Sequence, residues 1–302
     1  MKPARVHKSQ TPEALKVELA KSLEQRYVPP KFLYASPRQS ELWLQLHQQC
    51  APTAALGAPY LKAAPYLPKE IQSLVSLGCG GGEKEISILQ AIDRDIEFIP
   101  TDVSEPLVKA ATQAAIAGGV CTGTPLVFDL AAANDAAEFL SAHAKHSCLF
   151  TFFGIIPNFP PPSILPRVRS LMNKDDHLLA SANLSPRGMK DILPQYDNLP
   201  TRRWLEQFLT EHEITGGKLQ INICGQNNLE WFQADYVFES DTTISMDKWC
   251  IEYKTGDALQ MFVSHRYTPE TAAAVFAEYG LYIERIFLSE NREEGVFMCR
   301  PQ

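Results

Sequence analysis

Residues 74–84 read LVSLGCGGGEK, an apolar run that ends in a glycine-rich loop. Glycines let the backbone turn sharply and approach a ligand closely. The alternative is a tight strand-to-helix turn that holds no ligand. Glu83 stands where a dinucleotide-binding loop has its third glycine, and no Gly-Lys-Ser/Thr follows as in a P-loop. The loop therefore disfavours a pyrophosphate ligand and predicts a ligand site directly after the first strand of an α/β sheet.

Short apolar runs alternate with helical segments around this loop. The expected strands are 74–79, 97–103, 125–130, 148–154 and 177–184. Helical patterns lie between them, in the Ala-rich run 105–117, which ends before Gly118, and in 134–146 and 163–173. Strands that alternate with helices favour a parallel sheet with helices on both faces. The predicted fold class is α/β with a Rossmann-like sheet.

The alternation stops after residue 184. Residues 187–212 look helical, and 219–268 resemble consecutive antiparallel strands. A helix at 269–279 and strands at 281–289 and 295–300 return to the α/β pattern. We therefore predict a sheet domain of residues 63–186 and 267–302, with a second, α+β domain formed by 1–62 and the insertion 187–266.

Composition excludes several classes of protein. The 302 residues are 45% hydrophobic and 21% charged, which is ordinary for a globular chain. A net charge of −7 without a Lys/Arg run argues against a nucleic-acid partner. No apolar stretch is long enough to span a membrane, and the N-terminus lacks the apolar segment of a secretory signal. The seven cysteines stand singly, so we expect neither disulfides nor a metal site. We expect a cytoplasmic location for the same reason.

Two acidic residues follow the next two strands. Asp102 ends the second strand, 24 positions after Gly78, where a carboxylate can accept both hydroxyls of a ribose. Asp129 ends the third strand and could accept the amino group of an adenine, although a helix cap explains it equally well. A glycine loop and two acids at one edge of a sheet fit a nucleoside cofactor without a pyrophosphate. S-adenosylmethionine fits best.

Four segments of the chain form a recognisable set: LVSLGCGGGEKE (74–85), FIPTDVSEPLVKAA (98–111), FFGIIPNFPP (152–161) and QYDNLPTRRWLEQFL (195–209). Together they resemble the histidine-specific methyltransferases of ergothioneine biosynthesis and related enzymes that N-methylate tryptophan derivatives. The resemblance runs from Phe32 to the C-terminus. It implies a class I methyltransferase sheet with an added substrate-binding domain. The residues that it implies around the cofactor are Gly78, Gly80, Lys84, Asp102 and Asp129.

The resemblance also implies how the head group of an amino acid is held. Asn158 and Tyr196 match the family residues that bind its amine and carboxylate, and Tyr34 is expected to help seal the cleft. An amide and a phenol supply the donors and the acceptor that such a head group needs. Taken alone, Asn158 is explained as a turn residue and Tyr196 as a core residue.

The side-chain pocket departs from the family. Ser264 matches a family serine, but Phe262 replaces a glutamate that grips the imidazole, and Cys50-Ala-Pro-Thr53 replaces Tyr-Tyr-Pro-Thr. Alternation along a strand places 262, 264 and 266 on one face. Met246, on a strand expected beside it, would add an apolar wall, and Thr53 completes the expected pocket. Because polar partners for an imidazole are lost, histidine is not the expected substrate.

The sequence thus predicts an S-adenosylmethionine-dependent N-methyltransferase. Its expected partner is a small molecule, an amino acid or an amine derived from one, and neither nucleic acid nor a membrane. Two alternatives stay open. A protein that binds the cofactor without catalysis would give no product with any amine, and a nicotinamide-dependent oxidoreductase would bind NAD instead.

Overall fold

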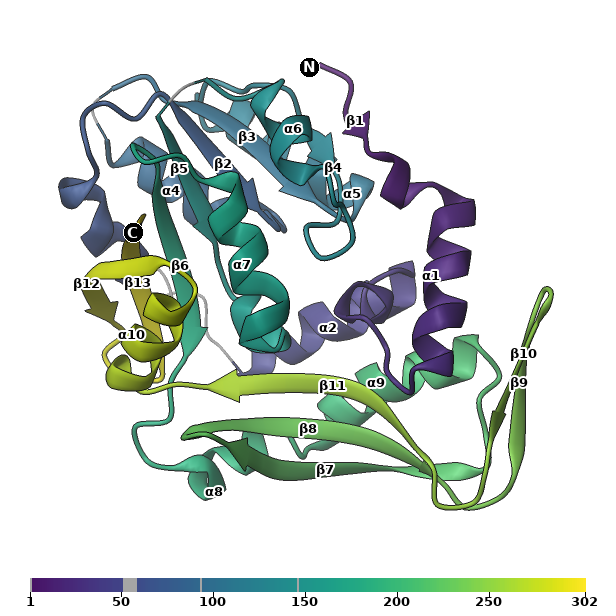
Figure 1. Cartoon of the computed structure of the whole chain (residues 1–302). Coiled ribbons are helices and arrows are strands. Elements are labelled where there is room, and N and C mark those ends of the chain that lie inside the picture. The colour runs from purple at the N-terminus through teal and green to yellow at the C-terminus, as the bar shows by residue number, and fades with distance from the viewer. Residues whose placement is uncertain (1, 51–58, 93, 146) are drawn as a thin grey trace. The chain divides into compact units, whose positions relative to one another are not determined.

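Figure 1 shows the computed structural model, which describes residues 2–50, 59–92, 94–145 and 147–302. The chain divides into two compact units. The first consists of Met1–Thr11, Ala54–Pro186 and Tyr267–Gln302, and the second of Pro12–Thr53 and Arg187–Arg266. The sequence had placed all of 1–62 with the insertion. Residues 2–11 and 59–62 belong instead to the first unit, because strand β1 (Arg5–Val6) pairs with its sheet and Tyr60 packs in its core.

The first unit contains an eight-stranded sheet. Its spatial order is β1-β4-β3-β2-β5-β6-β13-β12. Besides β1, the strands are β2 (Ser73–Leu77), β3 (Glu97–Asp102), β4 (Leu126–Val127), β5 (Cys148–Phe152), β6 (His177–Asn183), β12 (Leu281–Leu288) and β13 (Glu294–Pro301). Strands β1 to β6 run parallel, and β13 lies antiparallel between β6 and β12. The strands predicted between residues 74 and 184 are confirmed, as are the two near the C-terminus.

Helices cover both faces of this sheet (Figure 1). They are α4 (Glu83–Gln90), α5 (Glu105–Ala117), α6 (Ala136–Ser141), α7 (Pro161–Leu171) and α10 (Pro269–Glu278), with short 3-10 turns η1 (Lys8–Gln10), η3 (Ala64–Tyr66) and η4 (Ile156–Asn158). Helix α4 packs beside α5, and α6 beside α7. Helix α5 has the bounds expected from its sequence, with Gly118 as its C-cap. The predicted α/β class with helices on both faces is confirmed.

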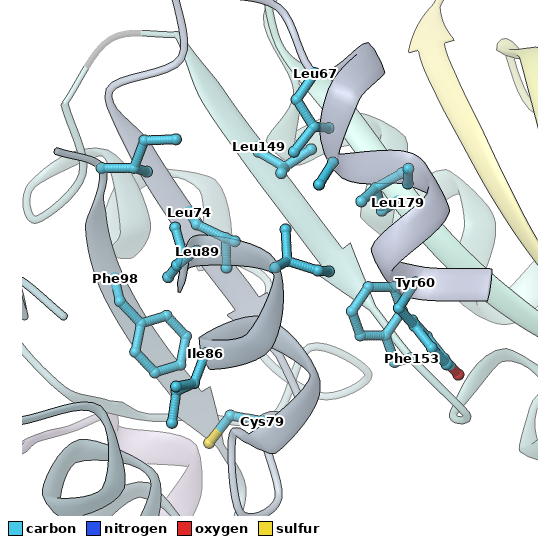
Figure 2. Packing of buried hydrophobic residues seen from close by; sticks show 14 of the residues in the cluster. Tyr60, Leu67, Leu74, Cys79, Ile86, Leu89, Phe98, Leu149, Phe153 and Leu179 are labelled. Atoms are coloured by element: carbon cyan, nitrogen blue, oxygen red, sulfur yellow. The ribbon is translucent and has the colours of Figure 1, made fainter. Parts of the chain in front are cut away.

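Buried side chains join α4 to the sheet, as Figure 2 shows. The labelled residues of this cluster are Tyr60, Leu67, Leu74, Cys79, Ile86, Leu89, Phe98, Leu149, Phe153 and Leu179. The rings of Tyr60 and Phe153 pack edge to face with centroids 4.5 Å apart. This contact holds residues 59–63, which are helical, to the segment after β5.

The second unit combines helices with antiparallel strands. Its strands are β7 (Gly217–Gln226), β8 (Leu229–Phe238), β9 (Thr242–Met246), β10 (Trp249–Tyr253) and β11 (Ala258–Arg266). Its helical elements are α1 (Pro12–Glu24), η2 (Pro30–Leu33), α2 (Pro37–Cys50), α8 (Met189–Ile192), η5 (Leu193–Gln195) and α9 (Leu199–Glu211). Strands β11, β8 and β7 form one sheet, and β9 and β10 form a separate hairpin. The antiparallel block predicted for 219–268 is confirmed.

Candidate functional site

The glycine loop connects β2 to α4. Gly78, Gly80 and Gly82 have φ angles of 80°, 50° and 76°, which L side chains rarely adopt. The Gly78 N–H donates to the Thr101 carbonyl at 2.9 Å, so the loop is tied to the end of β3. A Cβ at Gly78 would overlap the Ile155 side chain, whereas one at Gly80 would have no atom within 4 Å. The loop is therefore fixed at Gly78 and open above Gly80.

Asp102 lies where the sequence predicted it, at the end of β3 beside the loop. Its Oδ2 accepts the Gly80 N–H at 3.1 Å, and its Oδ1 accepts the Ser104 N–H at 3.0 Å. Burial raises the pKa of this carboxyl, and the backbone donors partly offset that shift. Each carboxylate oxygen can accept a further hydrogen bond, so Asp102 can also receive hydroxyl donors.

Asp129 is buried just after β4, which neighbours β3 in the sheet. Its Oδ1 accepts the Ala131 N–H at 2.7 Å. This bond closes a turn and does not cap a helix, because α6 begins only at Ala136, with Asp135 as its N-cap. The glycine loop, Asp102 and Asp129 follow three neighbouring parallel strands at the same edge of the sheet, where open α/β sheets bind ligands.

Asn158 lies at the same edge of the first unit. It ends the 3-10 turn η4 after β5 and is half-buried. Its backbone N–H donates to the Ile155 carbonyl at 2.9 Å, and the Ile155 side chain packs over Gly78. The structure thus places the turn that carries Asn158 beside the glycine loop.

Lys84, the second residue of α4, reaches a residue that the sequence did not single out. Its Nζ donates to the Tyr60 hydroxyl at 2.8 Å. Tyr60 stands in a Pro- and Ala-rich stretch that resembles a connector, and no motif marks it. Only its aromatic character within that stretch could have suggested a packed position.

In the second unit, Tyr196 lies at the centre of a polar and aromatic cluster. Its hydroxyl is 2.8 Å from Ser264 Oγ and accepts a hydrogen bond of 2.7 Å from Arg266 Nη2. Its ring stacks on Phe232 with a centroid distance of 4.2 Å. Ser264 and Arg266 are 1% and 6% exposed, so these polar groups meet away from water. Arg266 lies on the same face of β11 as Phe262 and Ser264, because alternate residues of a strand share a face. This alternation is the sequence signal that could have identified Arg266 as a site residue.

Aromatic rings continue from this cluster. The ring centroid of Phe262 lies 6.4 Å from that of Tyr196. Phe262 also packs edge to face on Trp204, with ring centroids 5.5 Å apart. Trp204 in turn contacts Tyr34 at 5.4 Å, and Tyr34 packs on Trp43. The predicted register of β11 is confirmed, because Phe262, Ser264 and Arg266 all face Tyr196. Burial raises the pKa of the Tyr34 phenol, so this ring stays neutral.

Two predicted pocket residues do not join this cluster in the way expected. Met246 was expected on a strand beside β11, but it ends β9, which pairs with β10 in the separate hairpin. The partner of β11 is β8. Met246 still packs against the core of the second unit, together with Phe262. Thr53 lies outside the described residues.

Within the described part of the chain, no three His, Cys, Asp or Glu side chains lie close enough together to hold a metal ion. None of the helices described there is long and apolar enough to cross a membrane.

Comparison with known proteins identifies a family. Residues 15–301 match the family model described as histidine-specific methyltransferase, SAM-dependent. No match was found among curated protein sequences. An S-adenosylmethionine-dependent methyltransferase from Clostridium acetobutylicum is 9% identical, with a TM-score of 0.45 over 87% of this chain and 97% of that one. The mitomycin 7-O-methyltransferase MmcR is 12% identical, with a TM-score of 0.48 over 97% of this chain and 70% of that one.

Proposed function

The chain belongs to the family of histidine-specific, S-adenosylmethionine-dependent methyltransferases, and we propose that it methylates a nitrogen of an amino acid or amino-acid-derived amine other than histidine. One observation carries the proposal. The polar chain of Arg266, Tyr196 and Ser264 lies next to Phe262, so donors for a head group stand beside an apolar wall.

S-adenosylmethionine would bind to the first unit. S-adenosylmethionine supplies a methyl group on a sulfonium, which a neutral nitrogen can accept without a covalent enzyme intermediate. The open space above Gly80 and the buried Asp102 carboxylate fit a nucleoside with two hydroxyls. Asp129 would receive the adenine amino group, and Lys84 would face the anionic end of the cofactor. The protein contributes mainly alignment, which is worth up to about 7–11 kcal/mol.

We expect Asp102→Ala to weaken binding of S-adenosylmethionine by about 1–3 kcal/mol, because the ribose hydroxyls lose their acceptor. Isothermal titration calorimetry measures the change. Asp135→Ala is the matched control, since this acid of the same unit pairs with Lys8 at the surface and should leave the affinity unchanged. Unaltered binding by Asp102→Ala, or binding of NAD in place of S-adenosylmethionine, would contradict the assignment.

The direction of the hydrogen bonds in the second unit favours a carboxylate. Arginine can only donate, so the Tyr196 hydroxyl accepts from Arg266 and gives its own proton to Ser264 or to a ligand. Where Ser264 accepts the Tyr196 proton, its own hydroxyl proton points to the ligand. One O–H donor, from Ser264 or from Tyr196 itself, is therefore left for a ligand, next to the positive charge of Arg266. An α-carboxylate is the part of an amino acid that matches such donors.

Asn158 would hold the amine of the substrate, as the family resemblance implies. Its amide oxygen can accept an N–H, and its amide nitrogen can donate. Accepting an N–H orients the lone pair of the nitrogen, which is the group that must attack the methyl.

Phe262 argues against histidine. An imidazole placed against this ring would leave a ring N–H without an acceptor, which costs roughly 1–3 kcal/mol. An aromatic substrate would instead pack on Phe262 and gain about 0.5–1.5 kcal/mol from edge-to-face contact. The neighbouring Trp204 extends the same apolar surface.

Competition between amino acids tests the proposal. Purified protein with S-adenosylmethionine is offered tryptophan, tyrosine, phenylalanine, leucine and histidine. We expect kcat/KM for histidine to be at least about tenfold below that for the best of the others, as the loss of one hydrogen bond implies. A value for histidine above all the others would overturn the proposed specificity. Cofactor binding without product from any amine would overturn the enzymatic assignment.

A further inference from the structure

A buried set of hydrogen bonds in the first unit joins Lys84 to Glu294 through Tyr60. Lys84 Nζ donates to the Tyr60 hydroxyl at 2.8 Å and lies 4.4 Å above the Tyr60 ring. The Tyr60 hydroxyl donates to Glu294 Oε1 and is 3.2 Å from Ser181 Oγ. Tyr60 is only 1% exposed. Three segments distant in the sequence thus meet at one phenol oxygen.

The chemistry of the three groups decides the direction of these bonds. Lysine can only donate, so the phenol oxygen accepts from Lys84, and its single proton goes to the Glu294 carboxylate. Burial and the adjacent Glu294 raise the pKa of Tyr60 well above its ordinary value, so the phenol keeps that proton. Packing on Phe153 fixes the ring, and Ser181 accepts the Gly154 N–H at 2.8 Å. Tyr60 is therefore a rigid acceptor for Lys84.

Lys84 is placed to bind an anion. It is the second residue of α4 and follows the glycine loop, where the helix dipole favours negative charge. Within the described part of the chain Tyr60 uses one of its three N–H groups, which leaves two for a ligand. S-adenosylmethionine has a single anionic group, the carboxylate of its amino-acid part.

We propose that Tyr60, anchored by Glu294, is a positioning residue that holds Lys84 ready for the carboxylate of the cofactor. A free lysine side chain loses rotamer entropy when it binds, and a side chain that is already held loses less. This inference rests on the cofactor of the family and involves no methyl acceptor. It can therefore fail while the proposed substrate class stands, and the reverse also holds.

Two ligands that differ only in the amino-acid part test the proposal. S-adenosylhomocysteine carries the carboxylate, and 5′-methylthioadenosine lacks the whole amino-acid end. We expect Tyr60→Phe to weaken binding of S-adenosylhomocysteine about two- to tenfold, the effect of ordering one flexible side chain. Binding of 5′-methylthioadenosine should change less than twofold. Calorimetric titration of the full-length protein gives both dissociation constants.

Tyr267→Phe is the matched control, because Tyr267 is a fully buried tyrosine of the same unit whose hydroxyl has no hydrogen-bond partner among the described residues. It should leave both affinities unchanged. In a Lys84→Met background, Tyr60→Phe should have no further effect on S-adenosylhomocysteine. Equal weakening of both ligands, an unchanged S-adenosylhomocysteine affinity, or tighter binding would overturn the proposal.

Glu294 provides a second route if the single variant does not fold. Its Oε2 is already buried without a hydrogen-bond partner among the described residues, and Tyr60→Phe would remove the donor to Oε1 as well. Tyr60→Phe combined with Glu294→Gln removes the buried charge together with the phenol. The double variant should show the same selective loss for S-adenosylhomocysteine, and a loss shared by both ligands would contradict the positioning role.

Discussion

Tyr196→Phe is expected to lower kcat/KM for methyl transfer by about a hundredfold and to leave the dissociation constant of S-adenosylmethionine unchanged. Phenylalanine keeps the stacking on Phe232 but removes the hydroxyl that accepts from Arg266 and that would donate, directly or through Ser264, toward the proposed substrate carboxylate. A hydrogen bond to a charged group is worth about 1.5–3 kcal/mol, or about 10- to 150-fold, and the variant loses the one that would reach the proposed substrate. Steady-state kinetics with the best amino acid found, together with calorimetry for the cofactor, measures both quantities.

Tyr253→Phe serves as the control for this variant. Tyr253 is another buried tyrosine of the second unit, and its hydroxyl donates to the Leu23 carbonyl at 2.6 Å. Its loss should lower the free energy of unfolding by about 0.5–1.5 kcal/mol without changing kcat/KM. An unchanged kcat/KM for Tyr196→Phe, or a parallel loss of cofactor affinity, would show that Tyr196 is a core residue only.

Phe262→Glu has the second large expected effect, on specificity. A glutamate at this position would accept the imidazole N–H and remove the aromatic wall. The two changes together are worth about 1.5–4.5 kcal/mol, from the hydrogen bond and the lost ring contact. We expect the ratio of kcat/KM for histidine to that for an aromatic amino acid to rise about a hundredfold. Competition between the two substrates in one reaction measures this ratio directly.

Phe262→Leu separates the two contributions. Leucine removes the ring that packs on Trp204 but brings no acceptor for an imidazole. Use of aromatic amino acids should fall, and kcat/KM for histidine should not rise. Should Phe262→Glu fold and leave the ratio where it was, the side chain at 262 would not contact the substrate.

Local sequence patterns were sufficient for most of the first unit and for the register of β11. Strands and helices there follow from apolar runs and from stop signals such as Gly118, and these act within a few residues. The sequence alone predicts that the glycine loop and Asp102 lie close together, because consecutive parallel strands end at the same edge of a sheet. Strand alternation likewise placed Phe262, Ser264 and Arg266 on one face before any contact was known.

The contacts between distant segments came only from the folded chain. Tyr60 meets Glu294 across 234 positions because β13 inserts beside β6, and no local pattern encodes that strand order. Met246 does not lie beside β11 because β9 pairs with β10 in a separate hairpin. Periodicity states which face of an element is buried, whereas the partner of that face depends on which elements pack together. Which elements pack together depends on the total burial and hydrogen bonding of the whole unit. The contacts of Tyr60 could therefore be found only from the tertiary structure.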